Sequence, residues 1–307
     1  MNDKKIKILV SSNCQTGGLA SSLNVFLRNS ISSIDVAPLH HINVEVEKLK
    51  IAQLLDDVDY WVTSYGWDIP EIKLSCEKNL KLKVIKIPAI SFSAFHPDLS
   101  YVLDKKSNKS LNGKFTYNSA IAIWLFNNNI DPSKAKYFYN QSTFNILGYK
   151  NMWAPSAKRL LDQFISLGFS PAEYHEFFNA IKRTGCFMHS VNHPKITLLF
   201  ELAKLIASRI NPSVKLDKLN TTIADPLMGA SIWPVYPDIA YSLGIDGSYL
   251  WKLGDAKLIN GLDSFILESY SHYENHHERG DLQLHAFHIS HDKFNDMMSS
   301  LNVKVNH

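Results

Sequence analysis

Short apolar runs alternate with helix-period segments along the first third of the chain. The apolar runs cover residues 6–12, 34–37, 59–63 and 82–87, and the segments between them cover 19–28, 45–56 and 69–79. In these segments apolar residues stand three and four positions apart, which is the spacing of one helix face. Because strands and helices in alternation are typical of wound α/β domains, we predict a mainly parallel sheet with flanking helices over residues 1–100.

The carboxyl ends of the predicted strands are where a site is expected, because open α/β sheets bind ligands outside those ends. They fall at residues 12–15, 64–67 and 88–96. Aromatic side chains, on which sugar rings and adenine both stack, crowd these ends: Tyr60, Trp61, Tyr65, Trp67, Phe92 and Phe95. Taken one at a time, each of them fits the core better than a ligand platform.

After residue 100 the pattern becomes mostly helical. The predicted helices cover 117–127, 132–141, 155–167, 171–183, 195–209, 262–274 and 291–300. Pro132, Gly168 and Pro171 fall at or just outside the predicted helix ends, where such residues belong. Residues 185–194 interrupt this series and are expected to return to the sheet. We therefore predict an α/β domain over 1–100 and a largely helical lobe over 101–307.

Composition and charge narrow the class of protein. The 307 residues are 45% apolar and 20% charged, as in globular proteins, and Lys plus Arg (32) nearly balances Asp plus Glu (29). A net charge of +3 is too small to indicate nucleic acid or an anionic membrane as the main partner. The guanidinium groups belong to Arg28, Arg159, Arg183, Arg209 and Arg279. A phosphate ligand must therefore use these residues, lysines or backbone amides.

The three cysteines, Cys14, Cys76 and Cys186, show no C-x-x-C spacing. An odd number without that spacing argues against a disulfide scaffold or a structural zinc site and fits a reducing compartment. The apolar run near the N-terminus is too short for a signal peptide, and no run reaches the roughly 18 apolar residues that span a bilayer. We expect a cytoplasmic protein without membrane insertion.

A thiol stands at the first predicted strand-to-helix turn, in the segment Asn13-Cys14-Gln15-Thr16-Gly17-Gly18. Unpaired N–H groups and the helix dipole at such a position favour a thiolate, so Cys14 is a candidate nucleophile. The same amides, together with the Gln15 side chain, are candidates for binding an oxyanion or a phosphate, and Thr16 and Gly17 would lie beside that ligand. The alternative is a small buried residue at a tight turn.

Two histidine segments are further candidates. In Phe95-His96-Pro97-Asp98, His96 is a possible general base with Asp98 as its orienting carboxylate; the alternative is that Asp98 caps the following segment. In the run 189–194, His189 or His193 is a possible base, and Asn192 is a possible contact for substrate or oxyanion. There the alternative is a helix cap by Asn192.

A histidine-rich tail contains His272, His276, His277, His285, His288 and His291. Its spacings fit no common zinc motif, and we expect no metal site. The chain also lacks G-x-G-x-x-G, G-x-x-x-x-G-K-[ST] and G-x-S-x-G. Their absence weakens the case for a dinucleotide-binding protein, a nucleoside triphosphatase or an ordinary serine hydrolase.

Taken in order, these segments resemble the WcbI family of capsular polysaccharide biosynthesis proteins. The resemblance rests on Asn13-Cys14-Gln15, on Ile87-Pro88 with Phe92 and His96-Pro97-Asp98, on Asn192-His193-Pro194, and on Pro234 and Pro237 leading to Leu243-Gly244. It extends over most of the chain. The segment Ser64-Tyr65-Gly66-Trp67 departs from the family, which would have a glutamine near that strand end.

The resemblance implies an acyltransferase that O-acetylates a capsular sugar with acetyl-CoA as donor, so coenzyme A and a sugar or glycan acceptor are the expected partners. Arg28, Arg159 and Arg183 are candidates for the CoA phosphates. Two mechanisms stay open, direct transfer with a histidine as base and transfer through an acetyl-Cys14 intermediate. The rival functions are a flavodoxin-like carbohydrate esterase and a non-catalytic glycan-binding or capsule-assembly protein.

Overall fold

The computed structural model describes residues 5–38, 45–104, 115–214, 222–254, 256–274, 282–286 and 288–305. The chain forms two compact units, and each is assembled from three segments. The first unit comprises Met1–Ile90, Arg159–Phe187 and His193–Leu227. The second unit comprises Ser91–Lys158, Met188–Asn192 and Met228–His307.

A four-stranded parallel sheet forms the centre of the first unit, as predicted from the alternating pattern. Its strands are β1 (Ile6–Ser11), β2 (Ile31–Val36), β3 (Tyr60–Thr63) and β4 (Lys83–Lys86), in the order β2-β1-β3-β4. Ser11 at the end of β1 pairs with Thr63 at the end of β3, and Thr63 pairs with Lys86. The carboxyl ends of these three strands therefore meet at one edge of the sheet.

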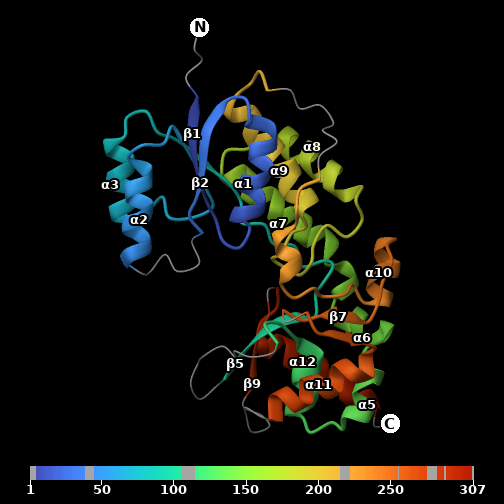
Figure 1. Ribbon diagram of the computed structural model, residues 1–307. Helices are drawn as coiled ribbons and strands as arrows, with labels where there is room; N and C mark the ends of the chain where they lie inside the picture. Colours follow the sequence, from blue (N-terminus) through green and yellow to red (C-terminus); the bar gives the residue numbers. More distant parts are fainter. Residues whose placement is uncertain are drawn as a thin grey trace. The chain divides into compact units, whose positions relative to one another are not determined.

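Helices cover both faces of this sheet (Figure 1). Helices α2 (Glu45–Leu55) and α3 (Pro70–Lys78) lie on one face, where Leu9 and Trp61 join their apolar cluster. Helices α1 (Thr16–Leu27) and α9 (Ile196–Ile210) lie on the other. Because side chains alternate along a strand, burial on both faces makes the central strands almost continuously apolar, which is the pattern read from the sequence.

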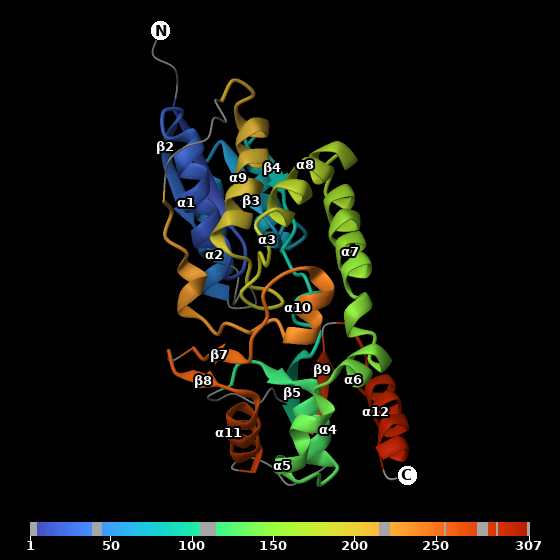
Figure 2. The same cartoon turned by 90° about the vertical axis from the view of Figure 1, so that its right-hand side faces the viewer.

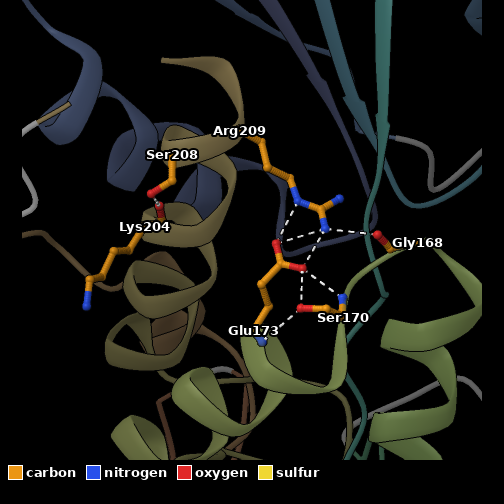
Figure 3. Close-up of polar contacts among 6 residues, drawn as sticks. All are labelled: Gly168, Ser170, Glu173, Lys204, Ser208 and Arg209. Atoms are coloured by element: carbon orange, nitrogen blue, oxygen red, sulfur yellow. Dashed lines mark hydrogen bonds and ion pairs between the residues drawn. The ribbon is translucent and has the colours of Figure 1, made fainter. Parts of the chain in front are cut away.

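Helix α9 packs against α1 and is in turn joined to α8 (Pro171–Lys182) by an ion pair (Figure 3). The Arg209 guanidinium donates to both carboxylate oxygens of Glu173 and to the Gly168 carbonyl, each at 2.9 Å. Glu173 also completes a capping box with Ser170 at the start of α8. The Glu173 carboxylate thus caps the start of α8 and binds Arg209 near the end of α9.

The second unit contains strands that the sequence analysis did not predict. They are β5 (Leu99–Asp104), β6 (Asn118–Ser119) and β9 (Leu282–Ala286) in an antiparallel sheet, and the hairpin of β7 (Leu250–Lys252) and β8 (Leu258–Asn260). The helices around them are α4 (Ala120–Asn127), α5 (Pro132–Ala135), α6 (Gln141–Ile146), α10 (Pro237–Leu243), α11 (Leu262–Glu274) and α12 (His291–Val305) (Figure 2). This unit is therefore largely helical, as predicted, with these short strands added.

The division of the chain differs from the predicted boundary at residue 100. Helices α8 and α9 lie in the first unit, together with α7 (Trp153–Ser166) from Arg159 onward, whereas residues 91–100 lie in the second unit. The physical reason is that the apolar face of α1 needs a cover, and α9 supplies it, with the Phe26 and Phe200 rings 4.6 Å apart.

Residues 185–194, all of which the structure describes, belong to no strand of the parallel sheet, so the predicted return to that sheet is wrong. The His189 carbonyl accepts instead from the Trp233 N–H, within the second unit. None of the helices that the structure describes is both long enough and apolar enough to cross a membrane.

Candidate active site

The turn that carries Cys14 is built by hydrogen bonds between Asn13 and Thr16. The Asn13 carbonyl accepts from the Thr16 N–H at 3.1 Å and from the Thr16 hydroxyl at 2.7 Å. The Thr16 hydroxyl oxygen also accepts from the Ser12 N–H at 2.9 Å. The Thr16 side chain is buried, and its hydroxyl makes hydrogen bonds only inside the turn. Thr16 therefore holds the turn in shape, and its hydroxyl does not fit the predicted role of a cofactor contact.

The Gln15 side chain is also used to build the turn. It is buried, its Nε2 donates to the Ile90 carbonyl at 2.9 Å, and its Oε1 accepts from the Ile90 N–H at 3.2 Å. These two hydrogen bonds hold the Cys14 turn against the loop that follows β4. The predicted oxyanion contact through the Gln15 amide is therefore replaced by a structural role.

Open backbone donors lie next in the chain, in the first turn of α1. Among the described residues, the N–H groups of Gly17 and Gly18 have no hydrogen-bond acceptor. A Cβ placed on Gly17 would meet no atom within 4 Å, whereas one on Gly18 would lie 2.7 Å from a methyl group of Leu199. The helix start is thus open on the Gly17 side, and an oxyanion or a phosphate at this place stays a prediction.

The Cys14 thiol is partly exposed beside this opening. Burial raises the pKa of Cys14, and this effect exceeds the lowering by its own backbone N–H. The Sγ atom lies 3.8 Å from the Asn13 Oδ1 atom. Contrary to the expectation of a favoured thiolate, burial in this turn disfavours the thiolate.

A tyrosine at the end of the next strand also belongs to this site. The Ser12 and Ser64 hydroxyls are 2.7 Å apart, so the β1 and β3 ends lie side by side, and Tyr65 follows directly. Burial and the charge of Cys14 raise the pKa of Tyr65, while a hydrogen bond with the Asn13 side chain lowers it. In the sequence, Tyr65 stands out only as one of several aromatic residues at strand ends, because nothing in its position reveals its proximity to Asn13.

His193 approaches from α9, within the same unit. It is half-buried and precedes the first residue of α9, Ile196, by three positions. The Ile196 N–H donates to the Asp225 carboxylate at 2.9 Å. Because Gly18 packs against Ile196 and Leu199, the starts of α1 and α9 adjoin, and the His193 segment enters at the end of α1 that carries the Cys14 turn.

The other predicted histidines and Asn192 lie in the second unit. The Phe92 N–H donates to the Val191 carbonyl at 2.7 Å, which ties together the loops that carry His96 and His189. Both imidazoles are buried.

Asn192 is held within that unit by tyrosines. Its Oδ1 accepts from the Tyr117 hydroxyl at 2.6 Å, and its Nδ2 donates to the Tyr101 hydroxyl at 3.3 Å. It therefore does not cap α9, whose first N–H is bound by Asp225.

Asp98 does not act as the orienting carboxylate of a catalytic pair. It is fully buried and accepts from the Tyr149 and Tyr236 hydroxyls at 3.1 and 2.8 Å and from the Ile121 N–H at 3.0 Å. Burial raises the pKa of Asp98 to about 6, against the lowering effect of these hydrogen bonds and of one from Ser119. Asp98 does act as a cap, but on α4, whose Ile121 lies 23 positions further on, and not on the segment directly after it, which is β5.

Of the predicted phosphate contacts, Arg28 follows α1 at its far end, about 18 Å along the helix from Thr16 at 1.5 Å per residue. Arg159 on α7 and Arg183 after α8 are exposed, and neither contacts the turn among the described residues. Lys86, the last residue of β4, is an exposed cation on the carboxyl edge of the sheet, 4.7 Å from the centre of the Trp67 ring. Lys86 thus lies at the sheet edge where β1 ends, whereas Arg28 lies at the opposite end of α1 from the Cys14 turn.

The described histidines of the histidine-rich tail form no common centre. His272 is buried with its ring 5.4 Å from that of Phe115, and His291 Nδ1 accepts from the Leu284 N–H at 3.2 Å. His276 and His277 lie outside the described residues. Within the described ranges, no three His, Cys, Asp or Glu side chains gather in a group that could hold a metal ion.

Known proteins resemble this chain in sequence family and in fold. The family described as polysaccharide biosynthesis enzyme WcbI matches residues 7–214, about two thirds of the 307 residues. A solved structure shares the fold. It is described as structural insights into WcbI, a novel polysaccharide biosynthesis enzyme, and as the native protein without a disulfide bond between CoA and Cys14. The TM-score is 0.65 at 12% identity, over 97% of this chain and 96% of that one.

No curated protein sequence matched the chain. The matched range contains the Cys14 turn, Tyr65, Lys86 and His193. The order of sequence motifs and the whole-chain likeness of the fold agree with the family match. The chain belongs to the WcbI family of polysaccharide biosynthesis enzymes.

Proposed function

We propose that this enzyme transfers an acetyl group from acetyl-CoA to a hydroxyl of a sugar in a capsular polysaccharide or its precursor. Membership of a polysaccharide biosynthesis family supports a sugar acceptor. The solved WcbI structure is described by the absence of a disulfide bond between CoA and its Cys14, which supports CoA as the other substrate. The chain studied here also carries a cysteine at position 14, at a strand end.

The observation that carries the proposal is the open first turn of α1 beside Cys14. A thioester carbonyl needs donors for the negative charge that develops on its oxygen. The N–H groups of Gly17 and Gly18 are such donors, and the space beside Gly17 lets a substrate approach them. The positive end of the helix dipole stabilises the same charge.

His193 is the histidine that the fold favours as base, since it belongs to the same unit as the turn. Its imidazole takes the proton of the sugar hydroxyl, and the sugar oxygen attacks the thioester carbon. The carbonyl electrons move to the oxygen, then return as the carbon–sulfur bond breaks. The imidazolium gives its proton to the departing sulfur. His96 and His189, which the sequence also named as possible bases, are buried in the second unit.

The state of Cys14 favours direct transfer over an acetyl-cysteine intermediate. A thiol attacks a thioester only as the thiolate, and burial raises the pKa of Cys14. We therefore assign Cys14 to the wall of the acyl site. Gln15 and Thr16 hold the turn in shape, and Asn192 orders the loop between His189 and His193.

The phosphates of CoA require cations. Lys86 stands on the carboxyl edge of the sheet with its ammonium over the Trp67 ring, and an adenine or a phosphate bound there would replace water around both side chains. Lys86 thus takes the role first expected of Arg28, Arg159 or Arg183. Because exposed charges are screened by salt, CoA affinity should fall as ionic strength rises.

Calorimetric titration and a transfer assay test the proposal together. CoA and acetyl-CoA should bind the wild-type chain, whereas NAD and nucleotides without a pantetheine arm should bind much more weakly. Lys86→Ala should weaken CoA binding by about tenfold, the loss of about 1.4 kcal/mol. Arg28→Ala, which removes a cation at the far end of α1, is the matched control and should leave it unchanged. Absence of CoA binding by the wild-type chain would overturn the proposal.

In the transfer assay, His193→Ala should lower the rate at least a hundredfold, the usual contribution of a general base. Cys14→Ser should retain a substantial part of the activity. Loss of all activity in Cys14→Ser, together with acetyl-Cys14 trapped in the wild type and seen by mass spectrometry, would replace direct transfer by the two-step mechanism. Acetate release that needs no sugar would identify an esterase instead.

A further inference from the structure

Asn13 builds the Cys14 turn with its oxygen atoms only. Its carbonyl accepts from the N–H and the hydroxyl of Thr16, and its side-chain Oδ1 accepts from the Gln15 N–H at 3.0 Å. Among the described residues, none of the hydrogen bonds inside the turn, from Ser12 to Thr16, uses the Asn13 NH₂ group. The proposed mechanism does not use this group either.

The hydrogen bond from Gln15 decides the orientation of the Asn13 amide. An N–H group must meet an acceptor, so the atom that lies 3.0 Å from the Gln15 nitrogen is Oδ1 and not Nδ2. The same Oδ1 lies 3.8 Å from the Cys14 Sγ atom. The NH₂ group is bonded to the same carbon as Oδ1, so it is fixed in the turn that carries the sulfur, with its hydrogens directed away from the Gln15 N–H.

The accessible side of the turn carries the groups that an acyl-transfer site needs. Within residues 11–20, Asn13 and Cys14 are partly exposed and Gly17 is exposed, whereas the other residues are buried. A ligand that reaches the sulfur therefore meets the Asn13 amide and the open helix start at Gly17. An NH₂ group carries two hydrogens, so a hydrogen bond with Tyr65 leaves one of them for a ligand.

We infer that Asn13 is a catalytic residue of this enzyme, whose NH₂ group donates a hydrogen bond to the thioester oxygen when that oxygen becomes negative. The inference rests on the proposed acetyl transfer and adds a side-chain donor to the backbone N–H groups. Acyl-transfer sites commonly combine the two kinds of donor.

The role of the Asn13 amide in the reaction is electrostatic. When the sugar oxygen bonds to the carbonyl carbon, the electron pair of the C=O bond moves to oxygen, and the Asn13 NH₂ group shares this charge with the N–H groups of Gly17 and Gly18. When the carbon–sulfur bond breaks, the pair returns to the carbonyl. The proton of the sugar hydroxyl passes through His193 to the departing sulfur, and Asn13 keeps both of its hydrogens.

Asn13→Asp removes the donor but keeps the turn. The carboxylate retains an oxygen for the Gln15 N–H, and its charge is favourable beside the start of α1, so the midpoint of urea unfolding should not fall. At saturating acetyl-CoA, kcat should fall by at least about a hundredfold, the usual loss for one oxyanion donor. Lower pH protonates the new carboxyl group and restores a donor without charge, so the ratio of the variant's kcat to that of the wild type should rise.

Asn211→Asp is the matched control. Asn211 Oδ1 accepts from the Ser213 N–H at 3.0 Å, and its Nδ2 donates to the Ser30 hydroxyl at 3.1 Å. Its amide oxygen thus binds the N–H two positions further on, as in Asn13, but Asn211 stands at the opposite end of α9 from His193. This change should leave kcat and its pH dependence as in the wild type.

A spectroscopic measurement tests the contact without relying on transfer. Acetyl-CoA labelled with a heavy isotope of carbon at its carbonyl is bound to the protein, and the C=O stretch is recorded by infrared difference spectroscopy. A hydrogen bond to the oxygen lowers the stretching frequency. The band should therefore lie at higher frequency in Asn13→Ala, which carries neither donor nor charge, than in the wild type or in Asn211→Ala. If Asn13→Ala does not fold, Asn13→Asp replaces it.

Two outcomes would overturn the role of Asn13 and leave the proposed function in place. The first is transfer by the wild type with an unchanged kcat in Asn13→Asp. The second is a carbonyl band at one frequency in the wild type and the Asn13 variant. Failure of the wild type to bind acetyl-CoA would instead overturn the proposed function, and the role of Asn13 with it.

Discussion

At the scale of single residues, Gly17 and Gly18 have opposite surroundings although they are neighbours in the first turn of α1. A methyl group on Gly18 would press against Leu199 and Ile196, at 2.7 and 3.3 Å, whereas one on Gly17 would enter open space. Gly18→Ala should therefore lower the free energy of unfolding by about 1–3 kcal/mol. Gly17→Ala should raise it by about 0.4–1 kcal/mol through loss of unfolded-state entropy. Urea unfolding measures both.

The two glycine variants also distinguish effects on stability from effects on CoA binding. Because the new methyl group of Gly17→Ala occupies the approach to the N–H donors, this variant should bind CoA more weakly despite its greater stability. Equal CoA affinity in Gly17→Ala and the wild type would place the substrate elsewhere.

The position of the turn could be predicted from the sequence, but the hydrogen-bond partner of each of its residues could not. A thiol between a strand and a helix is visible in the residue order, so Cys14 and the glycines were predictable. The commitment of Gln15 to Ile90 depends on a residue 75 positions away, and the contact of Tyr65 with Asn13 depends on which strand lies beside β1. No local pattern encodes such pairings, which is why the role of the Gln15 amide was misassigned.

At the scale of elements, Glu173 joins two helices with one side chain. Partial burial would raise the pKa of Glu173, but the Ser170 N–H and hydroxyl and the Arg209 guanidinium hold it below its ordinary value. Glu173→Gln keeps a residue that can complete the capping box and removes the charge paired with Arg209. It should cost about 1 kcal/mol. Glu173→Ala loses the cap as well and should cost about 1 kcal/mol more.

These costs are read from urea unfolding of the two variants and of Arg209→Ala. Combining Arg209→Ala with Glu173→Gln should add little to either single change, because both remove the same pair. Full additivity would mean that the ion pair contributes nothing to stability.

Element by element, the parallel sheet was predictable because short apolar runs mark its strands, continuous in the central β1 and β3, and alternate with segments of helical period. Strands β5 and β9 were not, since they pair Ser100 with Ala286 across most of the chain. The predicted helix over 117–127 begins only at Ala120, because Asn118 and Ser119 pair with β5. Long-range pairing overrides local preference in these places.

At the scale of the whole molecule, Asp98 makes stability depend on pH. Burial raises the pKa of Asp98 from 3.8 to about 6 in the folded chain, so between these values the folded state binds more protons than the unfolded state. Stability therefore falls as pH rises from about 4 to 6, by about 3 kcal/mol for this group. The stabilising contribution is complete below pH 4 and absent well above pH 6.

Asp98→Asn keeps an acceptor for the Ile121 N–H and carries no charge. As pH rises from about 4 to 6, the free energy of unfolding of the wild type should fall relative to that of Asp98→Asn. Asp246→Asn, at an exposed position, controls for the loss of a negative charge. If the free energy of unfolding of the wild type instead rose relative to that of Asp98→Asn as pH increases, burial would not be what raises the pKa of Asp98.

The assembly of each unit from separated segments has a consequence for synthesis of the chain. On the ribosome, β1, α1 and the rest of the sheet emerge long before α9, whose Phe200 and Leu199 cover Phe26 and Gly18. Until translation passes Ile210, the outer face of α1 stays uncovered and is a surface for chaperones or for aggregation. A gene truncated after the sheet should therefore yield insoluble protein, although every strand of the sheet is present.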